Sequence, residues 1–458
     1  MEALPQTRRQ MGVWAAMAVV TGEAISLGIF LTPAGMARSL GSPALLATIW
    51  CGMAVMTLAG ALCFTELAIR NPEDGGEYLY LRRGFGRHMA FLYGWMAAIV
   101  MYPGVAAALS VGTVPYIQAL LPVSPRIAAA LPAFTLLTLG AVNYLGTRLS
   151  ARVMTTLNWL KVPVLGSLIG WAFISGHATL TNVLPLTMRR PGSDPLVDAI
   201  AGATVSAFFC FGGWWEAGKI AGEVRNPSRN LPVAFCGGVL VVTAIYLLLS
   251  FAFVAVVPLQ QIQSNAAFVA LFGQALFGSA GARVLATCVV LCVLGGLTVL
   301  SMAVPRVTFA LARSEAGGTA HGPLAAFARL HPRFGTPANA VLLQTGMALL
   351  VLTLGAFDRI LAFIIFSAVA FLALTAATLF RTAPIKRWWY PLAPIVFIAS
   401  SCILALMLLM HNPGASLLGA AVVLCGLPVR WLLTRRSGIA PRGAGDETTP
   451  QDRALEQP

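Results

Sequence analysis

The chain has 458 residues, of which 58% are hydrophobic and only 10% are charged. Soluble domains carry about 25% charged residues, so this composition excludes an ordinary soluble globule and indicates an all-α integral membrane protein. The net charge of +14 is spread through short loops. Because these charges form no basic stripe, we expect membrane lipid around the chain and no nucleic-acid partner.

The residue types that carry catalysis or bind metals form no recognisable motif in the sequence. All eight cysteines lie in apolar stretches, where free thiols act as small buried hydrophobes. Cys288 and Cys292 share a helical face, but no histidine or acidic residue is near them in sequence. HExxH, GxSxG and P-loop sequences are also absent. The sequence therefore predicts no metal, no cofactor and no enzyme active site.

Long apolar runs predict twelve membrane-spanning helices of about 20 residues each. They lie near 13–36, 44–68, 89–120, 127–146, 153–175, 196–218, 232–257, 282–312, 337–355, 358–380, 391–410 and 415–433. An even number of spans puts both termini on one side of the membrane. Most Lys and Arg residues fall on that side, and the other side holds Arg38, Arg126, Arg189, Arg190, Arg283 and Arg359. The positive-inside rule then predicts cytoplasmic termini in the plasma (inner) membrane.

Two of these spans carry residues that interrupt a helix at membrane depth. The first contains TGEAISLGIFLTP (21–33), where glycines and Glu23 stand in the middle of an apolar run, and the sixth contains FFCFGGWW (208–215). Broken backbone is tolerated in a membrane only where protein encloses it or where it lines a wet cavity, so its free N–H and C=O groups are candidates for ligand binding. Two such spans in corresponding halves predict the central site of a secondary transporter.

The two breaks also divide the chain. The predicted parts are a cytoplasmic N-terminus (1–12), a first repeat of spans 1–5 (13–175), a second repeat of spans 6–10 (196–380), spans 11 and 12 (391–433) and a disordered cytoplasmic tail (437–458). Because five is odd, the second repeat must run through the membrane in the opposite sense, which predicts a 5+5 inverted repeat. Spans 11 and 12 are expected to be peripheral or dimer-forming.

The broken ends suit a zwitterionic ligand. The helix that resumes near Leu27 directs free N–H groups and its positive dipole end toward the membrane midplane, where they would hold a carboxylate. The carbonyl groups expected to accept hydrogen bonds from an ammonium group belong to Ala24, Phe209, Cys210 and Gly212. The alternative is that the glycines only allow close helix packing.

At these residues the chain resembles the amino acid, polyamine and organocation transporter superfamily, in its L-type amino acid transporter-like branch. The first break is similar to the pattern G-x-x-x-G-x-G-I-F at Gly22, Gly28, Ile29 and Phe30, with Ser26 at the middle glycine and Leu27 where serine is usual. Segments 60–86, 208–232 and 305–317 resemble the second, sixth and eighth spans with their adjoining loops. The resemblance covers roughly residues 10–380.

The resemblance implies the five-plus-five (LeuT-like) fold with broken helices 1 and 6, and an α-amino acid substrate. It implies that backbone amides at Ser26, Leu27 and Gly28 bind the carboxylate and that carbonyls of Ala24, Phe209, Cys210 and Gly212 bind the amine. Phe209 matches the aromatic outer gate. Trp214 and Trp215 are expected to pack around the second break, with Trp214 as the candidate to line the pocket.

Two charged residues at membrane depth are coupling candidates. A lysine there costs about 2.5–3.5 kcal/mol to insert, so Lys161 needs a partner inside the bundle. The resemblance places its ammonium group where related folds bind sodium, which implies sodium-independent transport; Lys161 then either moves a proton or holds the break together. Glu23 departs from the family. It would pair with Lys161, move protons or attract a cationic substrate, or it would be protonated and serve only in packing.

The remaining charged residues near the inner loops are interpreted as ion pairs that govern gating at most: Glu66, Arg70, Glu73, Asp74, Glu77, Arg82, Arg83, Glu223, Arg225 and Arg229.

The leading hypothesis is a permease that imports or exchanges an L-amino acid by alternating access, as a proton symporter or an exchanger. A polyamine or organic-cation carrier is the alternative, favoured by Glu23 and opposed by the lack of further carboxylates in mid-span. An intramembrane transferase would need a nucleophile-base pair or carboxylate cluster that the sequence does not clearly supply.

Overall fold

The computed structural model describes residues 9, 11–26, 28–73, 75–121, 123–258, 265–315, 324–354, 357–381, 387–411 and 413–436. Most of the predicted N-terminal segment, the predicted tail at 437–458 and Leu27 lie outside these residues. Within the described ranges the chain is helical, and its only pairing of the strand type is an isolated bridge between Met11 and Val224. The expected all-α class is therefore confirmed for this part of the chain.

The first half of the chain contains α1 (Val13–Ala24), α2 (Gly28–Leu40), α3 (Pro43–Arg70), α4 (Glu77–Met96), η1 (Ala97–Met101), α5 (Tyr102–Leu120), α6 (Pro125–Leu145), α7 (Thr147–Ile174) and α8 (Leu180–Val183). The second half contains α9 (Leu196–Phe211), η2 (Trp214–Glu223), α10 (Pro227–Pro232), η3 (Val233–Gly237), α11 (Gly238–Val256), α12 (Asn265–Phe277), η5 (Gly278–Ala280), α13 (Gly281–Glu315), α14 (Ala338–Leu354), α15 (Phe357–Ala377), η6 (Thr378–Arg381), α16 (Leu392–His411), α17 (Pro413–Leu424) and α18 (Gly426–Arg436).

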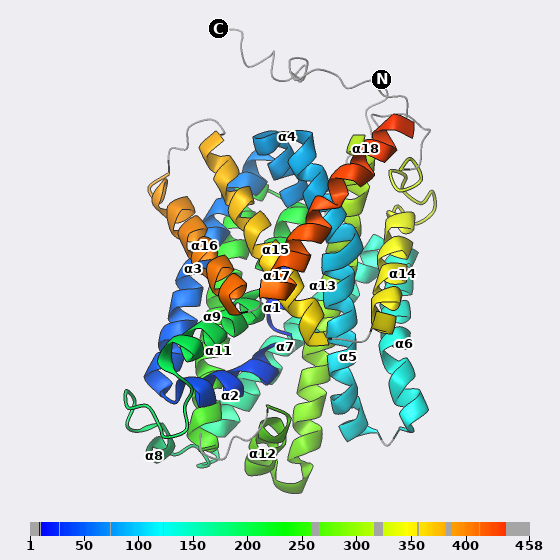
Figure 1. Ribbon diagram of the computed structural model, residues 1–458. Coiled ribbons are helices and arrows are strands. Elements are labelled where there is room, and N and C mark those ends of the chain that lie inside the picture. Colours follow the sequence, from blue (N-terminus) through cyan, green and yellow to red (C-terminus); the bar gives the residue numbers. More distant parts are fainter. Residues whose placement is uncertain are drawn as a thin grey trace.

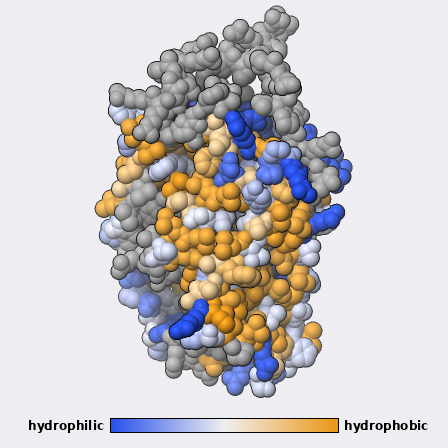
Figure 2. All heavy atoms as spheres, turned by 90° about the vertical axis from the view of Figure 1, so that its right-hand side faces the viewer, coloured by the Kyte–Doolittle hydropathy of each residue, from blue (hydrophilic) through white to orange (hydrophobic). Residues whose placement is uncertain are grey.

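The long helices form an upright bundle with an apolar outside. Among the described residues, eight helices are long and apolar enough to cross a membrane, and four shorter apolar helices accompany them. Large hydrophobic side chains such as Phe134, Leu240 and Ile403 are more than half exposed. Figure 2 shows hydrophobic residues gathered across the middle of one face and hydrophilic residues nearer its two ends. Such a surface is stable in lipid, because lipid tails solvate apolar side chains without cost.

The two ends of the bundle carry different elements. The start of α4 and the end of α18 lie at one end, and α2, α8 and α12 lie toward the other (Figure 1). Met11, just before α1, lies at the same end as the exit of η2, because its N–H donates to the carbonyl of Glu223 at 2.9 Å. The first and sixth spans therefore enter and leave the bundle side by side.

Both predicted interruptions are present. The helix of the first span ends at Ala24 and resumes at Gly28, and that of the sixth ends at Phe211 and resumes at Trp214. Gly213 has a φ of 96°, a left-handed conformation that favours glycine. The segment after this second break is a 3₁₀ helix, so its side chains repeat every three residues instead of every 3.6.

The third span is preceded by a separate helical segment. α4 begins at Glu77, but Gly86, at a φ of 85° and a ψ of 179°, interrupts it, so the helix that continues through a π-helical turn (η1) and α5 resumes close to the expected residue 89. Glu77 is the first residue of this segment and is 1% exposed, and it is ion-paired, as expected, with Lys219 as its partner. Gly75 and Gly76, at φ values of 129° and 52°, form the turn that buries it.

A buried ion pair fixes the C-terminal end of η2. Glu223 Oε1 lies 2.7 Å from the guanidinium of Arg306 on α13, and the two side chains are 9% and 8% exposed. The N–H of Arg225 donates to the carbonyl of Met11 at 2.8 Å beside this pair. The exit of the sixth span is thereby tied to α13 and to the start of α1.

Replacing Arg306 by glutamine should leave the Glu223 carboxylate buried without its charged partner. Breaking a buried pair in this way costs roughly 3–5 kcal/mol, so the thermal unfolding midpoint of the purified protein in detergent should fall markedly. Glu73→Gln is the matched control, because the Glu73–Arg83 pair is 59% and 50% exposed and such pairs contribute about 1 kcal/mol or less. Equal shifts for the two variants would contradict this role for Arg306.

Candidate functional site

A cavity lies between the two helix breaks. Its volume is about 60 Å³, several times the roughly 10–15 Å³ that a single buried water needs. Its walls come from both breaks, from α5 and from α15, and the lining residues are Glu23, Ala24, Ser26, Gly28, Met101, Tyr102, Val105, Leu109, Phe208, Phe209, Gly212, Gly213, Trp215, Ile365 and Ala368. A mainly apolar cavity with a few polar groups is typical of a small-molecule site.

The predicted carboxylate-binding residues lie on one wall of this cavity, except for Leu27, which is outside the described residues. Ser26 and Gly28 both line the cavity, and α2 begins at Gly28, so the positive end of its dipole is at the cavity. The N–H of Ser26 already donates to the carbonyl of Ala24 at 2.8 Å. A side chain at Gly28 would lie 3.0 Å from Sγ of Cys210, so the glycine lets α2 approach α9 closely.

Three of the four residues predicted to bind the amine line the cavity, and a tyrosine hydroxyl contacts the carbonyls of two of the four. Phe209 and Gly212 line the cavity, as does Ala24. The hydroxyl of Tyr246, on α11, lies within hydrogen-bond distance of the carbonyl of Ala24 and 2.8 Å from that of Cys210. Tyr246 thus joins the two breaks. It stands in an apolar span without any motif, so the sequence carried no signal for this role.

The aromatic residues of the second break are arranged differently from the prediction. Trp215 lines the cavity, whereas Trp214 packs with its ring centroid 5.0 Å from that of Phe64 and 5.9 Å from that of Phe397. Gly60 on α3 provides the space, because a Cβ there would lie 2.6 Å from the Trp214 indole. The interpretation of Trp214 as a pocket residue is corrected in favour of Trp215. Phe209, the predicted gate, does line the cavity.

Lys161 occupies the end of α1. Its ammonium group donates to the carbonyls of Gly22 and Ile25, the latter at 2.7 Å, and the residue is 1% exposed. These carbonyls are left without intrahelical partners where α1 stops, and a cation there also complements the negative end of the helix dipole. Gly295 on α13 faces the lysine side chain. Lys161 therefore connects α7 with the first break and with α13.

Glu23, next to Gly22 on α1, faces the second break. Its side chain covers Gly213, where an added Cβ would lie 2.5 Å from Cβ of Glu23. Its Oε2 is buried without a hydrogen-bond partner, although Glu23 lines the cavity. The predicted pairing of Glu23 with Lys161 is not among the ion pairs of the described residues, since the ammonium is directed at backbone carbonyls. A carboxylate oxygen at the cavity is thus left for another donor.

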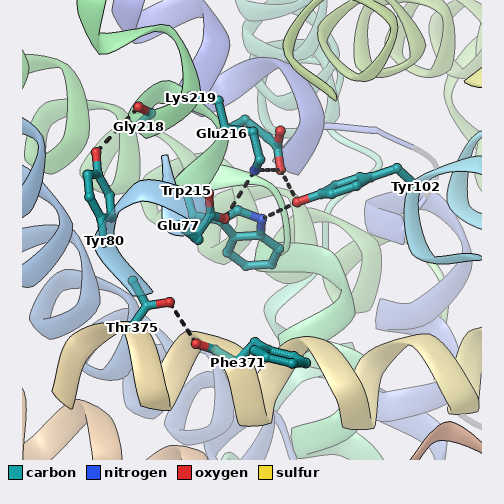
Figure 3. A network of polar contacts seen from close by, with 9 residues as sticks. All are labelled: Glu77, Tyr80, Tyr102, Trp215, Glu216, Gly218, Lys219, Phe371 and Thr375. Atoms are coloured by element: carbon teal, nitrogen blue, oxygen red, sulfur yellow. Dashed lines mark hydrogen bonds and ion pairs between the residues drawn. The ribbon is translucent and has the colours of Figure 1, made fainter. Parts of the chain in front are cut away.

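A cluster of three charged side chains next to the cavity was missed in the sequence. Lys219 Nζ lies 2.7 Å from Glu216 Oε1 and 3.1 Å from Glu77 Oε1, and all three residues are 1% exposed or less (Figure 3). Glu77 and Glu216 thus add two buried carboxylates to Glu23, and Glu216 lies near the end of the predicted sixth span. Glu216 and Lys219 directly follow the GGWW motif and looked like part of its exit loop. On a 3₁₀ helix, residues three apart share a face.

The sequence profile of a family described as amino acid permease matches residues 11–425. The chain is 26% identical over 441 residues to the serine/threonine exchanger SteT of Bacillus subtilis (strain 168), covering 94% of this chain and 98% of that protein. It is 27% identical over 444 residues to the large neutral amino acids transporter small subunit 2 of Homo sapiens, covering 93% and 80%. The Asc-type amino acid transporter 1 of Mus musculus is 26% identical over 445 residues, covering 93% and 81%.

A side chain at Gly295 should disturb the contact between Lys161 and the first break. A Cβ there would lie 2.2 Å from Cε and 2.6 Å from Nζ of Lys161, so the flexible end of the lysine must move away from its carbonyls. We expect Gly295→Ala to lower stability by about 1–3 kcal/mol, measured by thermal unfolding. Gly166→Ala on α7, where nothing lies within 4 Å, should not be destabilising. A Gly295→Ala protein as stable as this control would refute the role of the contact.

Proposed function

Because the chain belongs to the amino acid permease family, we propose that it carries an L-amino acid across the membrane by alternating access, importing it or exchanging it for another. The observation that carries the proposal is the meeting of two interrupted helices at one cavity. The start of α2 at Gly28 offers backbone donors on one side, and carbonyls near Phe209 and Gly212 lie on the other. This arrangement complements the two ends of a zwitterion.

A neutral side chain suits the apolar part of the cavity lining. Val105, Leu109, Ile365 and Ala368 line the cavity and offer apolar contacts and no charge. The relatives named above are an exchanger of serine and threonine, a transporter of large neutral amino acids and an Asc-type transporter. They are all transporters by name, which favours a carrier over the intramembrane transferase.

We further propose that the chain crosses the membrane twelve times with both termini in the cytoplasm, in a 5+5 inverted repeat followed by two further spans. The eight long and four shorter apolar helices of the described residues fall one in each predicted span, which supports this count. The excess of Lys and Arg on the side of the termini supports the orientation in a plasma (inner) membrane.

Transport is proposed to be sodium-independent. The ammonium group of Lys161 already supplies a positive charge to the Gly22 and Ile25 carbonyls at the end of α1. A sodium ion at the same carbonyls would have to lie against this ammonium group, and the repulsion between the two charges would oppose its binding.

A carrier of cationic amines is the second candidate, and Glu23 favours it. The unpartnered Oε2 of Glu23 lies at the cavity, and burying an ionised carboxylate without a partner is costly. An ammonium group of the substrate would supply the missing donor. In this version the substrate needs no carboxylate at the start of α2, and Glu23 pairs with one of its ammonium groups.

Uptake by proteoliposomes containing the purified protein tests the proposal. We expect radiolabelled neutral L-amino acids to enter vesicles preloaded with the same amino acid, at equal rates when sodium is replaced by choline. Lys161→Gln removes a charged donor contributing about 1.5–3 kcal/mol and should slow this uptake about tenfold or more. A sodium requirement would contradict the proposed role of Lys161, and failure to transport any amino acid would overturn the function itself.

Competition for uptake tests the part of Glu23 in selectivity. The ratio of the inhibition constants of a diamine and a neutral amino acid should rise about tenfold in Glu23→Gln, which corresponds to about 1.4 kcal/mol. Glu66→Gln is the control, because Glu66 pairs with Arg70 and Arg387 and does not line the cavity. A ratio that stays constant in Glu23→Gln would exclude contact between Glu23 and a cationic substrate.

A further inference from the structure

The Glu77–Lys219–Glu216 cluster is connected to the cavity by two of its lining residues. The hydroxyl of Tyr102, which lines the cavity, donates to Glu216 Oε1 at 2.9 Å. The indole N–H of Trp215, also at the cavity, donates to the Tyr102 hydroxyl at 3.4 Å (Figure 3). A substrate that touches Trp215 or Tyr102 is therefore two hydrogen bonds or fewer from Glu216.

The cluster has more negative than positive charge. Two carboxylates share the single ammonium of Lys219, and each also has an Oε2 atom that is buried without a hydrogen-bond partner. Glu23 adds a third carboxylate with a buried, unpartnered Oε2, and Lys161 is the second ammonium, used by the end of α1. Three carboxylates and two ammonium groups leave one negative charge, and an unpaired charge on a buried side chain is costly.

A single bound proton removes this imbalance. The groups that face Glu216 are Lys219 on its own helix, Glu77 and Tyr93 on α4, Tyr102 on α5 and Glu23 on α1. Among the carboxylates, Glu216 has the strongest connection to the cavity, through Tyr102. Glu77 keeps the ammonium of Lys219 as a partner when Glu216 becomes neutral, because Lys219 Nζ is 3.1 Å from it.

We propose that Glu216 binds a proton that moves together with the amino acid, which makes the carrier a proton symporter. This inference rests on the proposed function. The proton binds to the unpartnered Oε2 of Glu216 from the outer side through the cavity and leaves it to the cytoplasm, so one proton is carried for each cycle. When Glu216 is neutral, its attraction to Lys219 weakens, and η2 is held less firmly to α4.

The position of the cluster links this proton to the contact between η2 and the turn at Gly75 and Gly76 before α4. Lys219 also holds the backbone of the turn before α4, because its carbonyl accepts a hydrogen bond from the N–H of Gly75 at 3.2 Å. The Tyr80 hydroxyl donates to the carbonyl of Gly218 at 3.3 Å. A Cβ at Gly76 would lie 2.8 Å from Cγ of Lys219, so the contact is tight. Separating η2 from α4 on the cytoplasmic side requires that these contacts open.

The test measures proton and amino acid movement in the same proteoliposomes, with pyranine inside to report pH and with radiolabelled serine. In the wild type, external serine should acidify the interior, and an inward proton gradient should increase accumulation. In Glu216→Gln the serine-dependent acidification should be lost, and the ratio of gradient-driven accumulation to counterflow should fall at least fivefold. Glu66→Gln, at an ion pair away from the cavity, should retain both signals.

Glu77→Gln serves as the second variant if Glu216→Gln does not yield monodisperse protein. With only one carboxylate left beside Lys219, Glu216 should accept its proton less readily, so half-maximal uptake should shift by about one pH unit to lower pH.

A wild type that exchanges amino acids without moving protons would overturn this inference and leave the proposed function intact. Acidification that persists in Glu216→Gln, or an unshifted profile in Glu77→Gln, would overturn it as well. A wild type that transports no amino acid would overturn both.

Discussion

The need to satisfy every backbone polar group in the bilayer shapes this protein. A helix that stops inside the bundle leaves carbonyl and N–H groups without intrahelical partners, and each one that stays buried and unbonded is costly. Two side chains from other helices contact carbonyls at the breaks, although the Tyr246 hydroxyl has only one proton to share between its two. Lys161 serves the end of α1, and Tyr246 joins the carbonyls of Ala24 and Cys210 across the two breaks. The groups that remain at the cavity are those available to a substrate.

Close approach between the two breaks depends on glycines with specific neighbours. Gly28 lies against Cys210, and Gly213 lies under the side chain of Glu23. Larger residues at either place would push the half-helices apart and open the cavity to the rest of the bundle. The same space also fixes where Glu23 sits, so its carboxylate is held next to the second break. Packing at these positions therefore also fixes where the Glu23 carboxylate lies.

The breaks and Lys161 were predictable because each is a local anomaly: glycines or a charge inside an apolar run. Tyr246 and the choice of Trp215 over Trp214 were not, because they depend on contacts between spans far apart in sequence and on the 3₁₀ geometry of η2. Glu216 and Lys219 were overlooked for a related reason. Their cluster includes Glu77, which begins the segment of α4 ahead of the kink at Gly86, and a count of apolar runs gives no signal for a contact between segments so far apart in sequence.

The π-helical turn at Ala97–Met101 has its own consequence. A wide turn of this kind accommodates one residue more than an α-helix of the same length, and one residue corresponds to a rotation of about 100° around the helix axis. Tyr102, Val105 and Leu109 face the cavity in the register that this extra residue sets. In an alignment with a homologue whose third span is a regular helix, a one-residue gap belongs inside the turn. Without that gap, lipid-facing positions of the homologue would be compared with the cavity wall.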